Sequence, residues 1–214
     1  MDRRRRLTNA RNLEDAVRDL EASVIFFGAG GTQQQAAERW VVKHFLAALG
    51  IDFTDEELHN PSRDPPDIAF RDAAFEVKEI GEVGRRRHDE YREALARAKA
   101  ATTPAELQAQ FTMEDLPIAT VYERILAATA TLATHKYGER RTRHGLDLLF
   151  YVNLNPRKLW TFIDGDRPDV STLVGEGWRS VSFLHGDRTG RVIYASDGAP
   201  PFLLGAATQR DRPR

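Results

Sequence analysis

The stretch PPDIAFRDAAFEVKEI, residues 65–80, decides the fold that the rest of the chain must fit. It reads as two short strands, PDIAF and AAFEVKEI, joined by a tight turn at Arg71-Asp72. A two-residue loop places Phe70 opposite Ala73 and Asp67 opposite Glu76. Side chains alternate along a strand, so Glu76 and Lys78 share one face. The register therefore predicts two carboxylates side by side, with a lysine close by.

Two carboxylates in this position repel each other by roughly 4 kcal/mol at 4 Å and an effective dielectric near 20. Three arrangements relieve the repulsion: one carboxylate stays protonated, Lys78 neutralises part of the charge, or a divalent cation binds between them. Magnesium favours carboxylate and water ligands. A lysine beside such an ion can position or activate a water molecule. The bland alternative is a solvated strand face, which an E-x-K pair usually marks.

A strong amphipathic helix is predicted before the hairpin, over TQQQAAERWVVKHFLAALG, with Gly50 as its stop. Further helices are predicted over residues 12–23, 88–101 and 118–134. The nearly continuous apolar run LDLLFYVNL predicts a strand buried on both faces. LWTFI indicates another strand, and RSVSFLHGDRTGRVIYAS a second hairpin. This order of elements indicates an α/β fold with a mixed sheet.

The composition fits one soluble domain over residues 1–214, with core motifs in 32–80 and further helices and strands in 86–205. The absence of cysteine excludes disulfides and thiolate metal sites. No apolar run is long enough for a signal peptide or a membrane helix, so we expect a cytoplasmic protein without a membrane partner. The net charge of −1 argues neither for nor against nucleic-acid binding. The distribution of charge says more, because Arg85, Arg86 and Arg87 follow the hairpin directly.

The spacing of PD, eight further residues and EVK resembles the active-site signature of the PD-(D/E)xK nuclease superfamily. That superfamily commonly carries a glutamate on the helix before the hairpin, and Glu38 matches it by position. More narrowly, the runs ERWV, PPDIAFRDAAFEV, GRR, DEYRE, LDLLFYVNL and GWRSVSF resemble a bacterial domain-of-unknown-function family catalogued as candidate endonucleases. This likeness extends from about Glu38 to Ser182.

The resemblance implies a restriction-endonuclease-like fold, a mixed β-sheet flanked by helices. Asp67 and Glu76 would hold Mg²⁺ or Mn²⁺, helped by the Val77 carbonyl and by Glu38, and Lys78 would act on the attacking water. The reaction would be phosphodiester hydrolysis, with nucleic acid, most naturally DNA, as the partner. The arginines at 85–87 would contact phosphates. A homodimer is one assembly that the resemblance allows.

Two other interpretations stay open. The same fold could serve as a catalytically silent module that binds nucleic acid or protein, with Lys78 paired to Glu76 or Asp67. Alternatively, FFGAGGTQQQAAE could be the glycine turn of a dinucleotide-binding fold, but Gln33 stands where that motif needs its third glycine.

Overall fold

The computed structural model describes residues 13–19, 21, 32–81, 89–107, 112–113, 117–154, 158–159 and 168–208. The chain divides into two compact units, which we describe separately. One comprises Met1–Ala37, Gly81–Glu114 and Leu154–Trp160, and the other comprises Glu38–Ile80, Asp115–Asn153 and Thr161–Arg214. The single domain expected over residues 1–214 stays a prediction.

The larger unit is built on a six-stranded sheet with the order β1-β2-β3-β5-β7-β8. The strands are β1 (Leu58–His59), β2 (Ile68–Phe70), β3 (Ala73–Gly81), β5 (Asp147–Asn153), β7 (Ser180–His185) and β8 (Thr189–Ala195). Neighbouring strands are antiparallel in the pairs β1/β2, β2/β3 and β7/β8, whereas β5 and β7 are parallel. The sheet is therefore mixed, as the sequence predicts.

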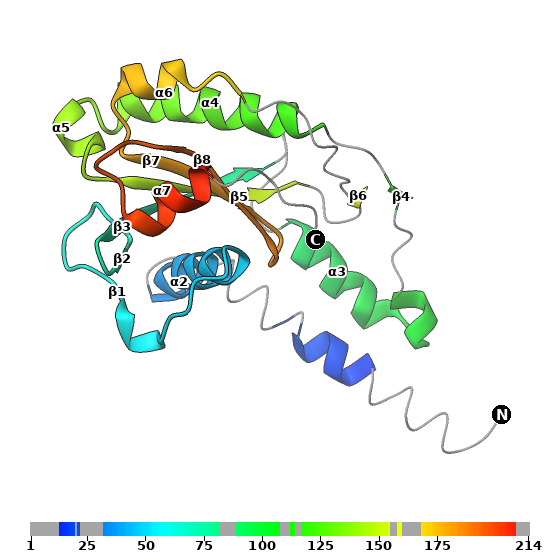
Figure 1. The fold of residues 1–214 in the computed structure, drawn as a ribbon. Helices are drawn as coiled ribbons and strands as arrows, with labels where there is room; N and C mark the ends of the chain where they lie inside the picture. The colour runs from blue at the N-terminus through cyan, green and yellow to red at the C-terminus, as the bar shows by residue number, and fades with distance from the viewer. Residues whose placement is uncertain are drawn as a thin grey trace. The chain divides into compact units, whose positions relative to one another are not determined.

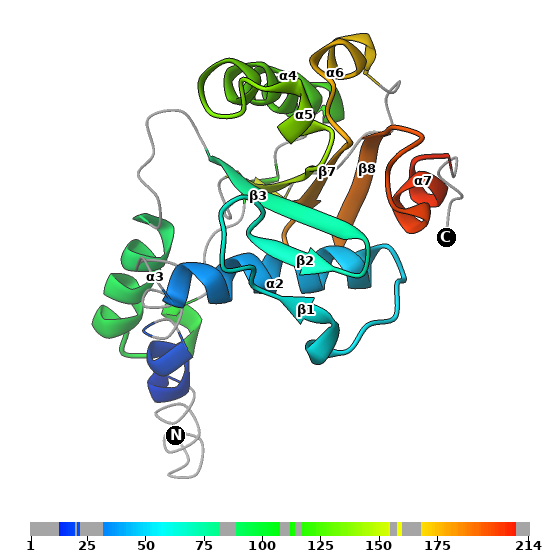
Figure 2. The same cartoon turned by 90° about the vertical axis from the view of Figure 1, so that its left-hand side faces the viewer.

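Helices cover both faces of this sheet (Figures 1 and 2). They are α2 (Thr32–Ala48), α4 (Ile118–His135), α5 (Arg140–Arg143), α6 (Ser171–Glu176) and α7 (Pro201–Thr208), with a 3-10 turn, η1, at Asp55–Glu57. On one face, α2 and α7 share a hydrophobic core with the strands. On the other face, α4 packs against β7 through Tyr122 and Phe183, whose ring centroids are 6.2 Å apart. The expected α/β fold, a mixed sheet flanked by helices, is confirmed.

One side of α2 packs into this core, and its buried face includes Val42 and Leu46, which the predicted apolar stripe did not include. Val42, Phe45 and Leu46 are completely buried, and the ring of Phe45 meets that of Phe75 on β3 edge to face. Gly50 ends the helix with a φ of +70°, a conformation that glycine adopts without penalty. The helix therefore fixes the buried side of the hairpin that carries the charged residues.

The smaller unit contains α3 (Asp89–Ala100), the 3-10 turn η2 (Pro104–Leu107) and a short parallel pair, β4 (Thr112–Met113) and β6 (Lys158–Leu159). Residues 13–19 are helical, which agrees with the predicted first helix. Of the strand predicted over LWTFI, only Leu159 lies within the described residues. No helix in the described part of the chain is long and apolar enough to cross a membrane.

Candidate metal centre

The hairpin has the register that the sequence predicts. Ile68 pairs with Phe75 and Phe70 pairs with Ala73, and Arg71 adopts a φ of +52° at the turn. Beyond the last paired residues, the Asp67 backbone N–H donates to the Phe75 carbonyl at 3.0 Å. The pairing therefore continues to Asp67, which lies beside Glu76.

Glu76 is completely buried, and its two carboxylate oxygens have very different surroundings. Oε1 accepts hydrogen bonds from the Tyr137 hydroxyl and the Lys78 ammonium, and from Lys136 Nζ at 3.1 Å. Oε2 is also buried but has no hydrogen-bond partner among the described residues. Burial raises the pKa of Glu76, but the donors on Oε1 outweigh it and hold the pKa below its ordinary value. A buried carboxylate oxygen without a protein partner is a position where a cation or an ordered water can bind.

Asp67 is the second carboxylate of the cluster. Its Oδ2 accepts the Val77 backbone N–H at 2.8 Å and lies 3.6 Å from Lys78 Nζ. Burial is the largest influence on Asp67 and raises its pKa. The positive charge of Lys78 lowers the pKa and the negative charge of Glu76 raises it, so the pKa of Asp67 lies above its ordinary value. The two facing carboxylates therefore have pKa values shifted in opposite directions.

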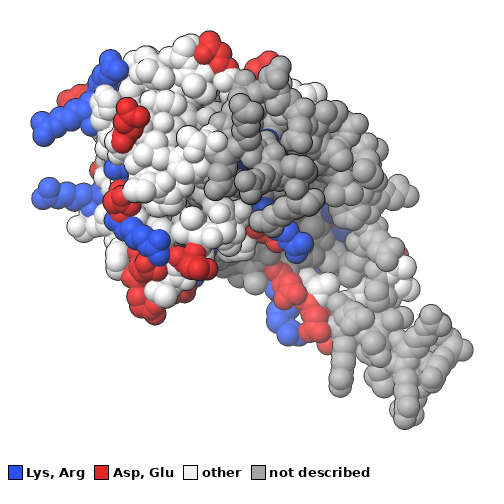
Figure 3. Space-filling model, in the orientation of Figure 1, with Lys and Arg blue, Asp and Glu red and all other residues white. Residues whose placement is uncertain are grey.

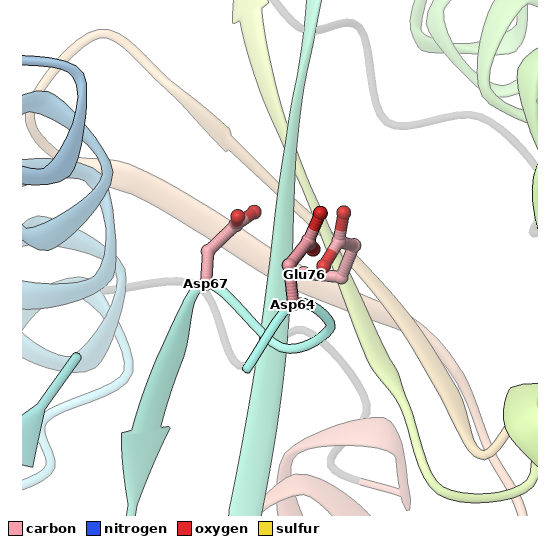
Figure 4. A group of neighbouring side chains, drawn as sticks. All are labelled: Asp64, Asp67 and Glu76. Carbon is pink, nitrogen blue, oxygen red and sulfur yellow. The ribbon is translucent and has the colours of Figure 1, made fainter. Parts of the chain in front are cut away.

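Asp64 completes an acidic cluster that the sequence analysis did not anticipate. One carboxylate oxygen each of Asp64, Asp67 and Glu76 lies within 4.8 Å of the others, and the three carboxyl groups gather beside β3 (Figure 4). Oxygens on opposite sides of an octahedral Mg²⁺ are about 4.2 Å apart, given bonds of about 2.1 Å. The cluster could therefore bind such an ion after a small inward movement of the side chains.

Lys78 holds the position that a cation would take in this cluster. Its ammonium donates to Glu76 Oε1 and to the Val77 carbonyl, the latter at 2.9 Å, and lies 3.6 Å from Asp67 Oδ2. These are the three groups of the hairpin that the sequence analysis assigned to a metal ion. The structure thus brings Asp67, Glu76, Val77 and Lys78 together, while the role of each stays a prediction.

Of the other predicted site residues, Glu38 alone lies within the described part of the chain. Glu38 is half-buried on α2 and lies outside the group of carboxylates within 4.8 Å. Arg85, Arg86 and Arg87 lie outside the described residues. Their assignment to metal or phosphate binding stays a prediction.

Two residues at the end of α4 contact the site and were not found from the sequence. Lys136 is the C-cap of α4, and Tyr137 is buried with its ring edge-on to Trp178 at 5.9 Å between centroids. Burial and the bond to Glu76 raise the pKa of Tyr137, so its hydroxyl stays a neutral donor. Partial burial lowers the pKa of Lys136, but its bond to Glu76 more than compensates and the net shift is upward.

Asp147, at the start of β5, shows what a purely structural buried carboxylate looks like in this sheet. One oxygen accepts from Arg179 Nε at 3.0 Å and the Ser180 hydroxyl at 2.7 Å, and the other from Arg179 and from the Ala74 backbone N–H at 2.9 Å. Both oxygens of Asp147 are satisfied, whereas one oxygen of Glu76 has no partner within the described ranges. This difference in hydrogen bonding distinguishes Asp147, which forms a structural ion pair, from Glu76, which is a candidate metal ligand.

The fold and this cluster define a mixed α/β protein with a carboxylate centre, suited to a metal ion, on a central hairpin. The chain belongs to the family described as "Putative endonuclease, protein of unknown function (DUF1780)", whose model matches residues 8–210.

Among solved structures, the chain is similar to a protein of unknown function from Pseudomonas aeruginosa strain PAO1, which is described as belonging to the monooxygenase superfamily. The two share 28% sequence identity over 94% of this chain and 93% of that one, with a TM-score of 0.62. No curated protein matches the chain.

Proposed function

We propose that this protein is a divalent-metal-dependent endonuclease that hydrolyses phosphodiester bonds in DNA, with a site of the PD-(D/E)xK, restriction-endonuclease-like kind. One observation carries the proposal: within a cluster of three carboxylates, Glu76 has a buried oxygen that no described residue contacts by a hydrogen bond. The family's description as a putative endonuclease supports the same reaction class.

The donor set fits a hard divalent cation such as Mg²⁺ or Mn²⁺, because all its ligand atoms are oxygens. Asp67, Glu76 and the Val77 carbonyl would hold the ion, with Asp64 as a further ligand. When bound, such an ion stabilises negative charge on a phosphate and lowers the pKa of a bound water. Glu38 is proposed as an additional ligand on the strength of the family resemblance alone.

Lys78 is the residue that we propose acts on the nucleophile. In the described state its ammonium neutralises the carboxylates, and a cation on those carboxylates would release it. From the same strand position it can hold a water by a hydrogen bond and orient it toward phosphorus. The water oxygen would form a new bond to phosphorus as the bond from phosphorus to the leaving oxygen breaks, and the proton that the water loses would reach the leaving oxygen through solvent.

DNA is proposed as the substrate, with Arg85, Arg86 and Arg87 as sequence-independent phosphate contacts and a homodimer as the assembly. On the face drawn in Figure 3, basic and acidic side chains of the described residues lie interspersed. The proposal therefore depends on the carboxylate centre and not on a basic surface. The competing function is a silent binding module in which Lys78 permanently occupies the cation position.

A cleavage assay tests the proposal directly. The purified protein is incubated with duplex, nicked and single-stranded DNA and with RNA, in magnesium, manganese or EDTA. Lys78→Ala is the test variant, and Lys43→Ala is the matched control. Lys43 is 29% exposed against 25% for Lys78, and it is also ion-paired, to Asp55 at 2.7 Å.

We expect metal-dependent cutting by the wild type and by Lys43→Ala, and none by Lys78→Ala. If the wild type is inert on every substrate and calorimetry detects no bound divalent ion, the catalytic proposal is wrong. Thermal stabilisation by a flavin or a nicotinamide dinucleotide, without stabilisation by metal, would instead favour a nucleotide-binding enzyme.

A further inference from the structure

We infer that Lys136 is a substrate-binding residue of this centre, whose ammonium leaves Glu76 and pairs with a phosphate oxygen of the nucleic acid once a divalent cation occupies the carboxylates. The inference rests on the proposed nuclease function and names a residue that the PD-(D/E)xK signature does not include.

The first argument is the crowding of Glu76 Oε1. A carboxylate oxygen offers two lone pairs, yet three donors point at Oε1 while Oε2 has none among the described residues. Tyr137 is a neutral, buried donor that can remain beside a bound cation. The two ammonium groups of Lys78 and Lys136 cannot both stay on Oε1, because a divalent cation bound to Glu76 repels them and competes for its charge.

The second argument is that the backbone of Lys136 is held in place while its side chain is partly exposed. Its side chain is 46% exposed, against 25% for Lys78, so its ammonium can reach a ligand that arrives from solvent. Its backbone is fixed, because the Lys136 N–H donates to the Leu132 carbonyl at 3.1 Å and the next residue, Tyr137, is buried against Trp178. The ammonium of Lys136 can therefore change its partner while its backbone stays in place. The C-terminal end of α4 also favours positive charge at this position.

The third argument is the charge of the assembled site. Three carboxylates and the two ammonium groups of Lys78 and Lys136 leave one negative charge. One divalent cation turns this into one positive charge, and one phosphodiester group restores neutrality. With a neutral side chain in place of Lys136, the same occupancy carries an uncompensated negative charge next to a desolvated centre.

The test measures nucleic-acid binding as a function of salt, in saturating calcium so that a metal ion is present. The proteins are the wild type, Lys136→Ala, Lys136→Arg and the control Lys43→Ala, each checked by thermal unfolding. A lost phosphate contact reduces the slope of log K against log salt by about 0.9 on duplex DNA and about 0.7 on a single strand. Affinity at low salt is expected to fall about tenfold, as for a charge-assisted hydrogen bond.

We expect Lys136→Ala to show the smaller slope, Lys136→Arg to restore it, and Lys43→Ala to match the wild type. If the wild type binds and Lys136→Ala keeps the full slope, the inference about Lys136 fails while the nuclease proposal stands. If the wild type binds no nucleic acid and cuts none in the cleavage assay, both fail together.

Discussion

Replacing Lys78 by alanine is expected to tighten the binding of a divalent cation, although it abolishes cleavage. The ammonium of Lys78 contacts all three hairpin groups that would hold the metal, and so it competes with the metal for them. Removing it leaves the carboxylates without this counter-charge. A lysine that acted on water from outside the ligand set would repel the ion only at longer range, so its removal would raise the affinity less.

The size of the effect can be worked from the described geometry. At 3.6 Å and an effective dielectric of about 20, the attraction between the Lys78 ammonium and the Asp67 carboxylate is roughly 4–5 kcal/mol. Hydration that the ammonium regains on turning outward returns most of this energy. If about 1.4 kcal/mol of it remains as the net cost of displacing Lys78, the dissociation constant of the metal falls about tenfold in the variant.

Isothermal titration calorimetry with Mn²⁺ and with Ca²⁺ measures this change, using wild type, Lys78→Ala and Lys43→Ala. Lys43 has a similar exposure and its own ion pair, so it reports the effect of simply removing one positive charge. The reasoning is wrong if Lys78→Ala, folded by its melting temperature, binds either ion as weakly as the wild type or more weakly.

Four further results follow from the same contacts. Glu76→Gln should abolish the rise in melting temperature that metal gives the wild type, as measured by differential scanning fluorimetry. Asp64→Asn changes an exposed residue, so it should weaken metal binding several-fold without changing the melting temperature of the metal-free protein. Metal affinity should fall as pH is lowered through the raised pKa of Asp67, at a higher pH than an ordinary aspartate would give, because only the ionised carboxylate binds; calorimetry across this range checks it. Asp147→Ala should cost about 3–5 kcal/mol of unfolding free energy in urea denaturation, because it leaves Arg179 without its buried partner, yet should not affect metal affinity measured by calorimetry under native conditions.

The hairpin could be predicted from the sequence because its determinants are local. Alternation between two faces and a two-residue turn fix which residues face each other, so Asp67 and Glu76 follow from counting. The α2 stripe and the end of that helix at Gly50 are local signals of the same kind. The short helix α7 was not predicted, because its eight residues carry an apolar run without a clear helical period.

The rest of the site depends on tertiary contacts that no spacing reveals. Tyr137 lies 61 positions after Glu76 and reaches it only because α4 crosses the sheet and ends there. A lysine and a tyrosine at the end of an amphipathic helix, as at Lys136 and Tyr137, are common, so the sequence alone does not identify them as site residues. Asp64 precedes the hairpin in a proline-rich loop, and its closeness to Glu76 depends on the path of that loop.

The hydrogen bonds to the buried carboxylates of the sheet are distributed unevenly, and this difference bears on why the hairpin carries charged residues. A structural solution was available to this sheet, as Asp147 shows by satisfying both of its oxygens with Arg179, Ser180 and a backbone N–H. At Glu76 the donors among the described residues all bind one oxygen, and the other oxygen is buried without a partner among them, an arrangement that costs stability. Under the proposed function, a cation held by Glu76 and Asp67 would remove that cost and would free the ammonium groups of Lys78 and Lys136 to act on water and to bind the phosphodiester.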